Sequence, residues 1–233
     1  MIYLDSSNVE EIKRFKSYGI IDGVTSNPSI MLKDGVKDVE KAVKELVKVT
    51  HPLHLSVEVM TNDEEQMIYE AREYTKMGNN IVIKIPIHGP NGELDNLRVI
   101  SRLRKNEVKV NATCCMSAIQ CILAAKAGAD YVSLFGGRVN DMGGDVVKEI
   151  SKIMSFLAGH GMCQNKIWGE RTTGTKLIIG SVREAKNVLD WLEAGADIVT
   201  VPPSILEKMI VHVGTKDVVS TFLNDARKIT NGR

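Results

Sequence analysis

The phrase Ala127-Gly128-Ala129-Asp130-Tyr131-Val132 returns later in the chain as Ala194-Gly195-Ala196-Asp197-Ile198-Val199. In each copy a helical segment ends at a glycine, and a strand of β-branched or aromatic residues begins a few residues later. A helix that turns so tightly into a strand is typical of folds in which right-handed crossovers join parallel strands. The repeated phrase therefore predicts a mostly parallel sheet.

Short β-branched runs recur on both sides of these phrases and alternate with segments of helical periodicity. The eight expected strands are residues 2–5, 23–26, 54–60, 81–87, 109–113, 131–135, 176–181 and 198–201. The helices expected after them are residues 9–18, 36–50, 63–77, 92–105, 116–127, 144–159, 183–194 and 204–211. Capping residues are expected at Asn8, Asn62, Ser117 and Ser204, and closing glycines at Gly19, Gly78, Gly128 and Gly195.

Eight strand–helix units close naturally into a barrel, and such barrels often span a chain of this length. We therefore expect an α/β protein with one (β/α)8 TIM barrel domain over residues 1–233. An open, doubly wound sheet is disfavoured, because no Gly-x-Gly-x-x-Gly follows the first strand. An additional C-terminal helix is expected within residues 215–230, and no strand follows it.

The charges of the chain nearly cancel, with 30 Lys and Arg against 29 Asp and Glu. This balance argues against a dedicated binder of nucleic acid or of anionic membranes. The apolar runs are too short to span a bilayer, so we expect neither a nucleic-acid nor a membrane partner. The first residues, Met-Ile-Tyr-Leu-Asp, do not resemble a secretory signal, which predicts a cytoplasmic location.

The chain contains four cysteines, namely Cys114, Cys115, Cys121 and Cys163. Adjacent cysteines are poorly placed for a disulfide framework, and no Cys-x-x-Cys occurs. We expect reduced, mostly buried thiols and no metal site.

Strands of a parallel barrel should be almost continuously apolar, so polar residues within them indicate candidate site positions. In residues 81–87, alternation places Lys84 on the face opposite four isoleucines and therefore inside the barrel. Burial favours a neutral amine, which is the nucleophile that forms Schiff bases with carbonyls, although a lysine at a strand end can also reach water. Asp5 ends the first strand and could serve as an acid/base or as a helix cap. Glu58 shares a face with Ser56 and fits a proton-handling group.

Further polar residues follow the same pattern in later strands. Asn111 and Thr113 share one face of the fifth strand, and Ser133 and Phe135 share one face of the sixth. Ser181 ends the seventh strand. Arg138 and Arg183 follow two successive strands, which predicts either an anion site at the barrel mouth or two surface arginines.

Taken together, these segments resemble the transaldolase family, and in particular its short-chain branch, which includes the fructose-6-phosphate aldolases. The matching phrases are Tyr3-Leu4-Asp5-Ser6, Gly23-Val24-Thr25-Ser26-Asn27-Pro28-Ser29, Val82-Ile83-Lys84-Ile85-Pro86, Val110-Asn111-Ala112-Thr113, Ser133-Leu134-Phe135-Gly136-Gly137-Arg138 and Gly180-Ser181-Val182-Arg183. They occur in family order over nearly the whole chain.

The resemblance implies a role for each of these residues. Lys84 matches the Schiff-base lysine, Asp5 the acid/base acting on the substrate C4 hydroxyl, and Glu58 with Thr113 the pair that holds a catalytic water. Substrate contacts are implied for Thr25, Asn27, Asn111, Ser133, Phe135 and Ser181, and a phosphate clamp for Arg138 and Arg183. The implied partners are sugar phosphates, no cofactor is implied, and the chain is expected to form a homo-oligomer of five or ten copies.

Two positions separate the branches of this family. The aldolases carry Gln in place of Glu58 and Tyr in place of Phe135, so this chain resembles the transaldolases, which act in the non-oxidative pentose phosphate pathway. The alternatives are an aldolase that releases dihydroxyacetone and a non-catalytic barrel that binds sugar phosphates. The C-terminal helix carries an apolar stripe at helical spacing, for which we expect a neighbouring subunit as cover rather than its own barrel.

Overall fold

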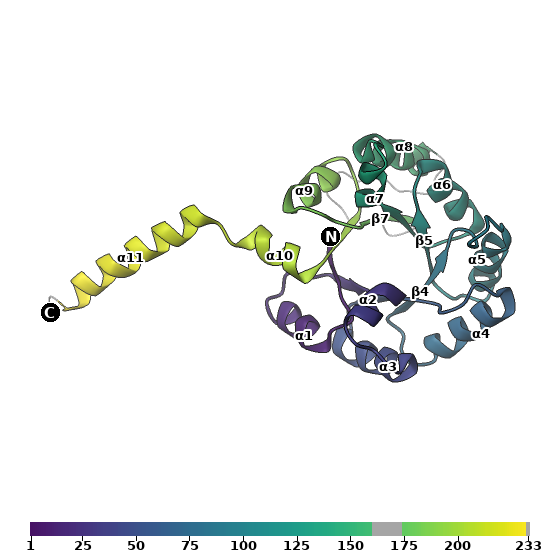
Figure 1. The fold of residues 1–233 in the computed structure, drawn as a ribbon, viewed down its shortest axis with the longest axis horizontal. Helices are drawn as coiled ribbons and strands as arrows, with labels where there is room; N and C mark the ends of the chain where they lie inside the picture. Colours follow the sequence, from purple (N-terminus) through teal and green to yellow (C-terminus); the bar gives the residue numbers. More distant parts are fainter. Residues whose placement is uncertain (160–173, 232–233) are drawn as a thin grey trace.

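A computed structural model describes residues 1–159 and 174–231, and in these residues eight parallel strands close into a barrel in the order of the sequence (Figure 1). The strands are β1 (Ile2–Asp5), β2 (Gly23–Thr25), β3 (His54–Glu58), β4 (Ile81–Pro86), β5 (Val110–Cys115), β6 (Tyr131–Phe135), β7 (Lys176–Gly180) and β8 (Ile198–Val201). The predicted (β/α)8 barrel with an additional C-terminal helix is confirmed. All eight strands lie within two residues of their expected ends.

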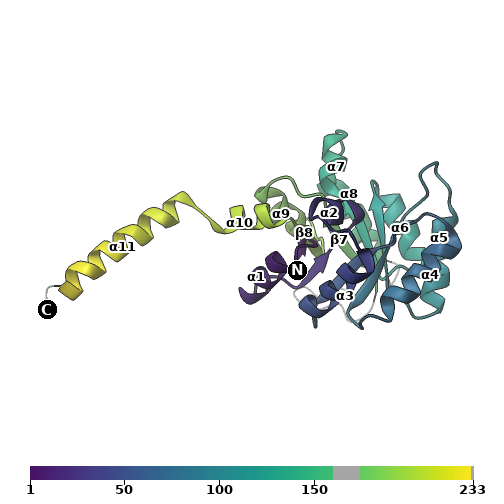
Figure 2. The same cartoon turned by 60° about the horizontal axis from the view of Figure 1, so that its bottom comes forward.

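The helices that follow the strands form the outer ring of the barrel (Figures 1 and 2). They are α1 (Val9–Ser17), α3 (Val39–Thr50), α4 (Glu64–Thr75), α5 (Asp95–Lys105), α6 (Ala118–Ala127), α8 (Val146–Gly159), α9 (Ala185–Glu193) and α10 (Pro203–Ile210). Two further short helices were not expected: α2 (Pro28–Lys33) after β2, and α7 (Gly136–Asp141) after β6. Both have six residues, which is too short to show a helical period in the sequence.

The helix caps agree only in part with expectation. Asn8 caps α1 by accepting from the backbone amides of Glu10 and Glu11, as predicted. The expected caps at Asn62 and Ser204 are wrong, because Asp63 caps α4 through its side chain and α10 already begins at Pro203. Ser117 stands at the start of α6 but makes no capping hydrogen bond through its side chain, and Gly128 closes that helix in the left-handed region.

Two apolar layers hold the barrel together. The larger lies between strands and helices and contains the isoleucine face of β4, with Ile81, Ile83, Ile85 and Ile87 all buried. The smaller lies inside the barrel and consists of Tyr3, Ile178 and Ile198, with the half-buried Tyr131 against them. Because side chains alternate along a strand, the residues opposite the isoleucines, including Lys84, face the barrel interior.

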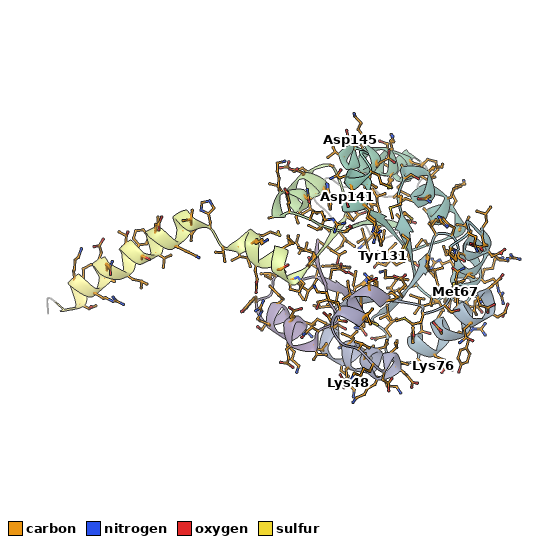
Figure 3. The ribbon with its side chains drawn as sticks, viewed as in Figure 1. Lys48, Met67, Lys76, Tyr131, Asp141 and Asp145 are labelled. Carbon is orange, nitrogen blue, oxygen red and sulfur yellow. The ribbon has the colours of Figure 1, made fainter. Side chains whose placement is uncertain are left out.

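Aromatic rings fill the amino-terminal end of the barrel. The ring of His54 lies 5.0 Å from that of Tyr3 and 4.6 Å from that of Tyr131, measured between centroids. A Cβ at Gly23 would lie 2.7 Å from the Tyr3 ring, so only glycine fits beneath it. Figure 3 shows Tyr131 near the centre of the ring of strands, whereas Lys48 and Lys76 project outward from the helices.

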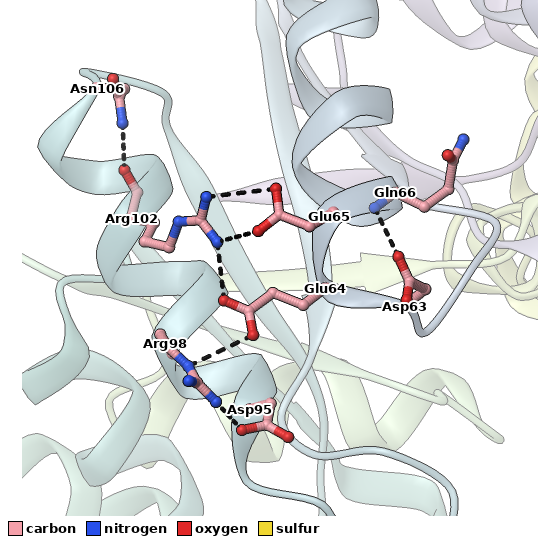
Figure 4. Close-up of polar contacts among 8 residues, drawn as sticks. All are labelled: Asp63, Glu64, Glu65, Gln66, Asp95, Arg98, Arg102 and Asn106. Atoms are coloured by element: carbon pink, nitrogen blue, oxygen red, sulfur yellow. Dashed lines mark hydrogen bonds and ion pairs between the residues drawn. The ribbon is translucent and has the colours of Figure 1, made fainter.

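An ion-pair network joins α4 and α5 on the outer surface (Figure 4). Arg102 contacts Glu64 at 2.9 Å and Glu65 at 2.6 Å, and Arg98 contacts Glu64 at 3.4 Å. Because Arg98, Arg102 and Glu65 are exposed, water and salt screen these pairs and each contributes little to stability. They fix how α4 and α5 lie side by side and do not reach the barrel interior.

The last helix, α11 (Val213–Asn231), extends away from the barrel in both views (Figures 1 and 2). Its residues are exposed, including the apolar Val218, Val219, Phe222 and Leu223. The alternative in which this helix folds back on its own barrel is therefore not what the structure shows.

Two observations bear on the remaining expectations. Among the described residues, no helix is long and apolar enough to cross a membrane. Cys163 lies outside the described residues, as does most of the stretch 159–175.

Candidate active site

A cavity of about 520 Å³ lies at the carboxyl ends of the strands, which is the end where barrel enzymes hold their substrates. Lys84 and Glu58 lie at its floor, and Asp5 and Thr25 form one wall. The other lining residues are Asn27, Pro28, Ser29, Ile30, Lys33, Thr113, Cys114, Met116, Ser133, Phe135, Arg138, Gly180, Ser181 and Thr200. Ten of the twelve expected site residues therefore line one cavity, and Asn111 and Arg183 do not.

Lys84 is buried, with its amine held between two oxygen atoms. Its Nζ lies 3.0 Å from Glu58 Oε2 and donates to the backbone carbonyl of Ser26 at 2.9 Å. Lys84 and Glu58 face each other because they are register partners on β4 and β3. This arrangement fixes the amine at the floor of the cavity and places a proton-accepting group against it.

Asp5 sits at the end of a short chain of hydroxyl groups. Thr25 donates to Asp5 Oδ1 at 2.6 Å, and the Thr200 hydroxyl lies 2.5 Å from that of Thr25. Because Thr25 gives its single proton to Asp5, Thr200 is the donor of the second contact. Burial raises the pKa of Asp5, against the lowering effects of the Thr25 hydrogen bond and of the charge on Lys84. Such a carboxyl group can both take up and return a proton.

Asn111 lies behind the cavity wall rather than on it. Ser133 Oγ donates to Asn111 Oδ1 at 2.7 Å, and Asn111 Nδ2 donates to Ser56 Oγ at 3.2 Å. All three residues are buried. In this arrangement Asn111 orients Ser133, which does line the cavity.

An irregularity in β5 shapes the next part of the wall. The pairing of β5 with β6 shifts register between Ala112 and Cys115, and Cys114 takes a positive φ of 62° there. Bulges of this kind re-aim side chains and are frequent beside active sites. The bulge turns Cys114 toward the cavity, where burial raises the pKa of its thiol. The hydroxyl of Thr113 is fully buried beside Cys114 and meets no partner within ordinary hydrogen-bond distance among the described residues.

Three cations follow the carboxyl ends of strands, and they differ in their surroundings. Arg138 and Lys33 line the cavity, and within residues 1–159 and 174–231 no carboxylate forms an ion pair with either. Arg183 contacts Asp141 Oδ2 at 2.9 Å instead. Two cations of the mouth are therefore available to an anionic ligand, and the third would first have to leave Asp141.

The position of Arg138 depends on a close approach of two backbones. A Cβ at Gly137 would lie only 1.8 Å from the carbonyl oxygen of Ser181, so that the start of α7 can pack against the end of β7 only with glycine there. Ser181 itself has a positive φ of 60°. This contact brings Arg138 and Ser181 to the same side of the cavity.

Eight lining residues were not among the expected site residues, and two of these, Thr200 and Lys33, bear on the chemistry of the cavity. Thr200 is a polar residue within an apolar strand, so the rule that selected Glu58 and Asn111 could have found it. Lys33 lies on the unexpected helix α2, and only the placement of that helix over the cavity brings it to the site.

A cavity at the carboxyl end of a (β/α)8 barrel, with a buried lysine beside a carboxylate at its floor, defines a barrel enzyme. Comparison with known proteins then places the chain within this class. Residues 2–232 match the family model described as transaldolase/fructose-6-phosphate aldolase. The chain therefore belongs to the transaldolase/fructose-6-phosphate aldolase family.

The relatives share nearly the full length of the chain. A probable transaldolase of Methanococcus maripaludis is 38% identical over 223 residues, which cover 96% of this chain and 95% of that protein. A probable transaldolase of Petrotoga mobilis is 39% identical over 230 residues, with 97% and 95% covered. One from an Anaeromyxobacter species is 36% identical over 227 residues, with 97% and 96% covered.

Proposed function

We propose that the protein is a transaldolase of the non-oxidative pentose phosphate pathway. It would move a dihydroxyacetone unit from a ketose phosphate, either sedoheptulose 7-phosphate or fructose 6-phosphate, to glyceraldehyde 3-phosphate or erythrose 4-phosphate. The observation that carries the proposal is the buried amine of Lys84 beside Glu58 at the floor of the cavity.

The first half of the reaction forms the covalent bond to the enzyme. The Lys84 amine attacks the C2 carbonyl of the ketose, and loss of water gives an iminium ion that accepts the electron pair of the adjacent bond. Glu58 and Thr113 are lining residues of the cavity and would hold the water that moves protons during these steps.

The second half breaks and remakes a carbon–carbon bond. Asp5 takes the proton of the C4 hydroxyl, the C3–C4 bond breaks, and its electron pair moves into the iminium to give an enamine on Lys84. The aldose phosphate leaves, a second aldose phosphate enters, and the steps reverse. Thr25 holds Asp5 in place for both proton transfers.

Phe135 and Glu58 favour transfer over release of dihydroxyacetone. Phe135 lines the cavity and offers no hydroxyl that could deliver a proton to the enamine through water. An unprotonated enamine stays on Lys84 until an aldehyde arrives. Arg138 and Lys33 would hold the phosphate groups at the mouth, and Arg183 would join them on release from Asp141.

We also propose that α11 ties copies of the chain into a ring of five or ten subunits. Its exposed stripe of Val218, Val219, Phe222 and Leu223 supports this, because apolar side chains so grouped are usually covered by a partner.

Borohydride trapping tests the proposed reaction. Incubation with fructose 6-phosphate and reduction should leave a three-carbon adduct on Lys84, and Lys84→Met should abolish both adduct and turnover. An adduct on another lysine contradicts the mechanism, and the absence of any adduct favours a non-catalytic binding barrel. The rate of fructose 6-phosphate cleavage, measured with and without an acceptor aldehyde, distinguishes a transaldolase from an aldolase. Release of free dihydroxyacetone without acceptor, at a rate comparable to that with acceptor, indicates an aldolase.

A further inference from the structure

Four polar side chains form a line through the barrel from its amino-terminal face to the active-site cavity. His54 Nε2 lies 2.6 Å from Ser56 Oγ, which accepts from Asn111 Nδ2, and Asn111 Oδ1 accepts from Ser133 Oγ. Ser133 lines the active-site cavity, whereas His54 lines a separate cavity of about 280 Å³ at the opposite end. The proposed reaction uses neither His54 nor Ser56.

With the Asn111 amide oriented as in the structure, the number of protons available sets the direction of this line. An amide Nδ2 can only donate, so Ser56 Oγ accepts from Asn111 and its single proton is free for His54. An amide Oδ1 can only accept, so Ser133 gives its proton to Asn111. The lengths fit this order, since 2.7 Å is usual for O–H···O and 3.2 Å is the long end for N–H···O.

His54 can end the line only as a neutral ring whose proton is on Nδ1, because Nε2 must accept. Its surroundings favour the neutral ring. Burial, together with the positive charges of Lys109 and Lys176, lowers the pKa of His54 to about 3. The rings of Tyr3 and Tyr131 pack against it, and burial raises the pKa of both phenols, which keeps them uncharged.

If the hydrogen bonds ran in the opposite direction, the role of Ser133 in the cavity would change. If Nε2 carried the proton, it would donate to Ser56, Ser56 would donate to a reversed Asn111 amide, and Asn111 would donate to Ser133. Ser133 would then point a free O–H into the cavity. The position of one proton on His54 thus decides whether Ser133 meets a ligand as donor or as acceptor.

We propose that His54 is a positioning residue that, through Ser56 and Asn111, holds Ser133 as a hydrogen-bond acceptor in the active-site cavity. Ser133 then selects a ligand that presents a hydroxyl donor at this point of the wall. The identity of that ligand as a ketose phosphate rests on the proposed function, whereas the direction of the hydrogen bonds does not.

Nitrogen-15 NMR of histidine-labelled protein tests the direction without any turnover. The His54 signals are identified by their loss in His54→Phe, a ring that can fill the same space between Tyr3 and Tyr131. At pH 7 we expect Nδ1 to be protonated and Nε2 to be bare. A proton on Nε2, or on both nitrogens, overturns the proposal even if the protein proves to be a transaldolase.

Steady-state kinetics tests the consequence at the site. His54→Phe should raise KM for fructose 6-phosphate by about 3- to 10-fold, the loss expected for one neutral hydrogen bond, and change kcat less. His51→Phe is the matched control, because His51 lines the same distant cavity without joining the line.

A double-mutant cycle identifies the route of the effect. If His54 acts through Ser56, His54→Phe combined with Ser56→Ala should raise KM no more than Ser56→Ala alone. Effects that multiply, or a KM in His54→Phe equal to that of His51→Phe, contradict the proposal. If the wild-type protein shows the expected NMR result but no borohydride adduct on Lys84, the proposed reaction is overturned and the hydrogen-bond direction set by His54 is not.

Discussion

The Lys84 amine lies 3.0 Å from the Glu58 carboxylate, and the two residues are register partners on adjacent strands. Only 5% of the Lys84 side chain and 10% of the Glu58 side chain are exposed. At this depth each charge depends on the other, because neither can be fully hydrated. The pair therefore serves stability as well as chemistry.

Removal of Glu58 should destabilise the protein more than its size suggests. Glu58→Ala leaves the ammonium of Lys84 buried without its partner, and we expect the free energy of unfolding to fall by about 3–5 kcal/mol. Urea denaturation measures this change. Glu65→Ala is the control, since Glu65 also pairs with a cation but is 75% exposed, and it should lower the free energy of unfolding much less. Equal losses of stability in the two variants would show that burial of the Lys84–Glu58 pair does not increase the cost of breaking it.

Asp5→Asn should separate Schiff-base formation from carbon–carbon cleavage. The amide cannot take the C4 proton, so turnover should fall by about 10²- to 10⁴-fold while Lys84 still reacts. Mass spectrometry after borohydride reduction should then find a six-carbon adduct in place of the three-carbon one. Asp225→Asn, on the exposed helix α11, should behave as wild type. A three-carbon adduct in Asp5→Asn would remove Asp5 from the cleavage step.

The acid limb of the pH profile should also report Asp5. Cleavage needs the carboxylate, and burial raises its pKa above the ordinary 3.8. We therefore expect kcat/KM to fall with an apparent pKa above that value as the pH is lowered.

The cations at the cavity mouth should differ in their effect on phosphorylated acceptors. Arg138→Ala and Lys33→Ala remove cations that line the cavity, and each should lower kcat/KM for glyceraldehyde 3-phosphate by about 10-fold or more. Arg183→Ala should cost less, because Arg183 must first leave Asp141. Unphosphorylated D-glyceraldehyde is the control substrate. If both acceptors lose equally, these residues do not bind the phosphate.

The sequence predicts the barrel and the interior positions because both depend on local periods. Alternation along β4 places Lys84 on the face toward the barrel interior, and this placement does not depend on distant parts of the chain. The same holds for Glu58 on β3. Contacts between distant segments carry no such signal. The pairing of Arg183 with Asp141 and the place of Lys33 over the cavity depend on the path of α7 and α2, which are too short to show a period.

The neutral state of His54 should make the protein sensitive to acid. Its pKa is about 3 in the folded chain and 6.5 unfolded, so the unfolded chain binds more protons between these values. The stabilisation is complete above pH 6.5 and is lost as the pH falls toward 3. The difference in free energy of unfolding between wild type and His54→Phe should therefore shrink by at most about 1.4 kcal/mol per pH unit. A difference that stays constant from pH 7 to pH 4 would mean that His54 is hydrated and titrates normally.

Truncation after Val211 should dissociate the oligomer and leave the barrel intact. The residues of α11 are exposed and extend away from the strands, so their removal takes nothing from either apolar layer. The exposed stripe that includes Phe222 and Leu223 is the surface against which a second copy of the chain would pack. Sedimentation velocity should find the full chain as a ring of five or ten subunits and the truncated chain as a smaller species. Circular dichroism should show that the barrel of the truncated chain is still folded.

The double variant Phe222→Ser with Leu223→Ser should also weaken assembly, whereas Lys228→Ser, on the same helix but outside the stripe, should not. A truncated chain that keeps the oligomer size of the full chain would show that another surface holds the subunits together.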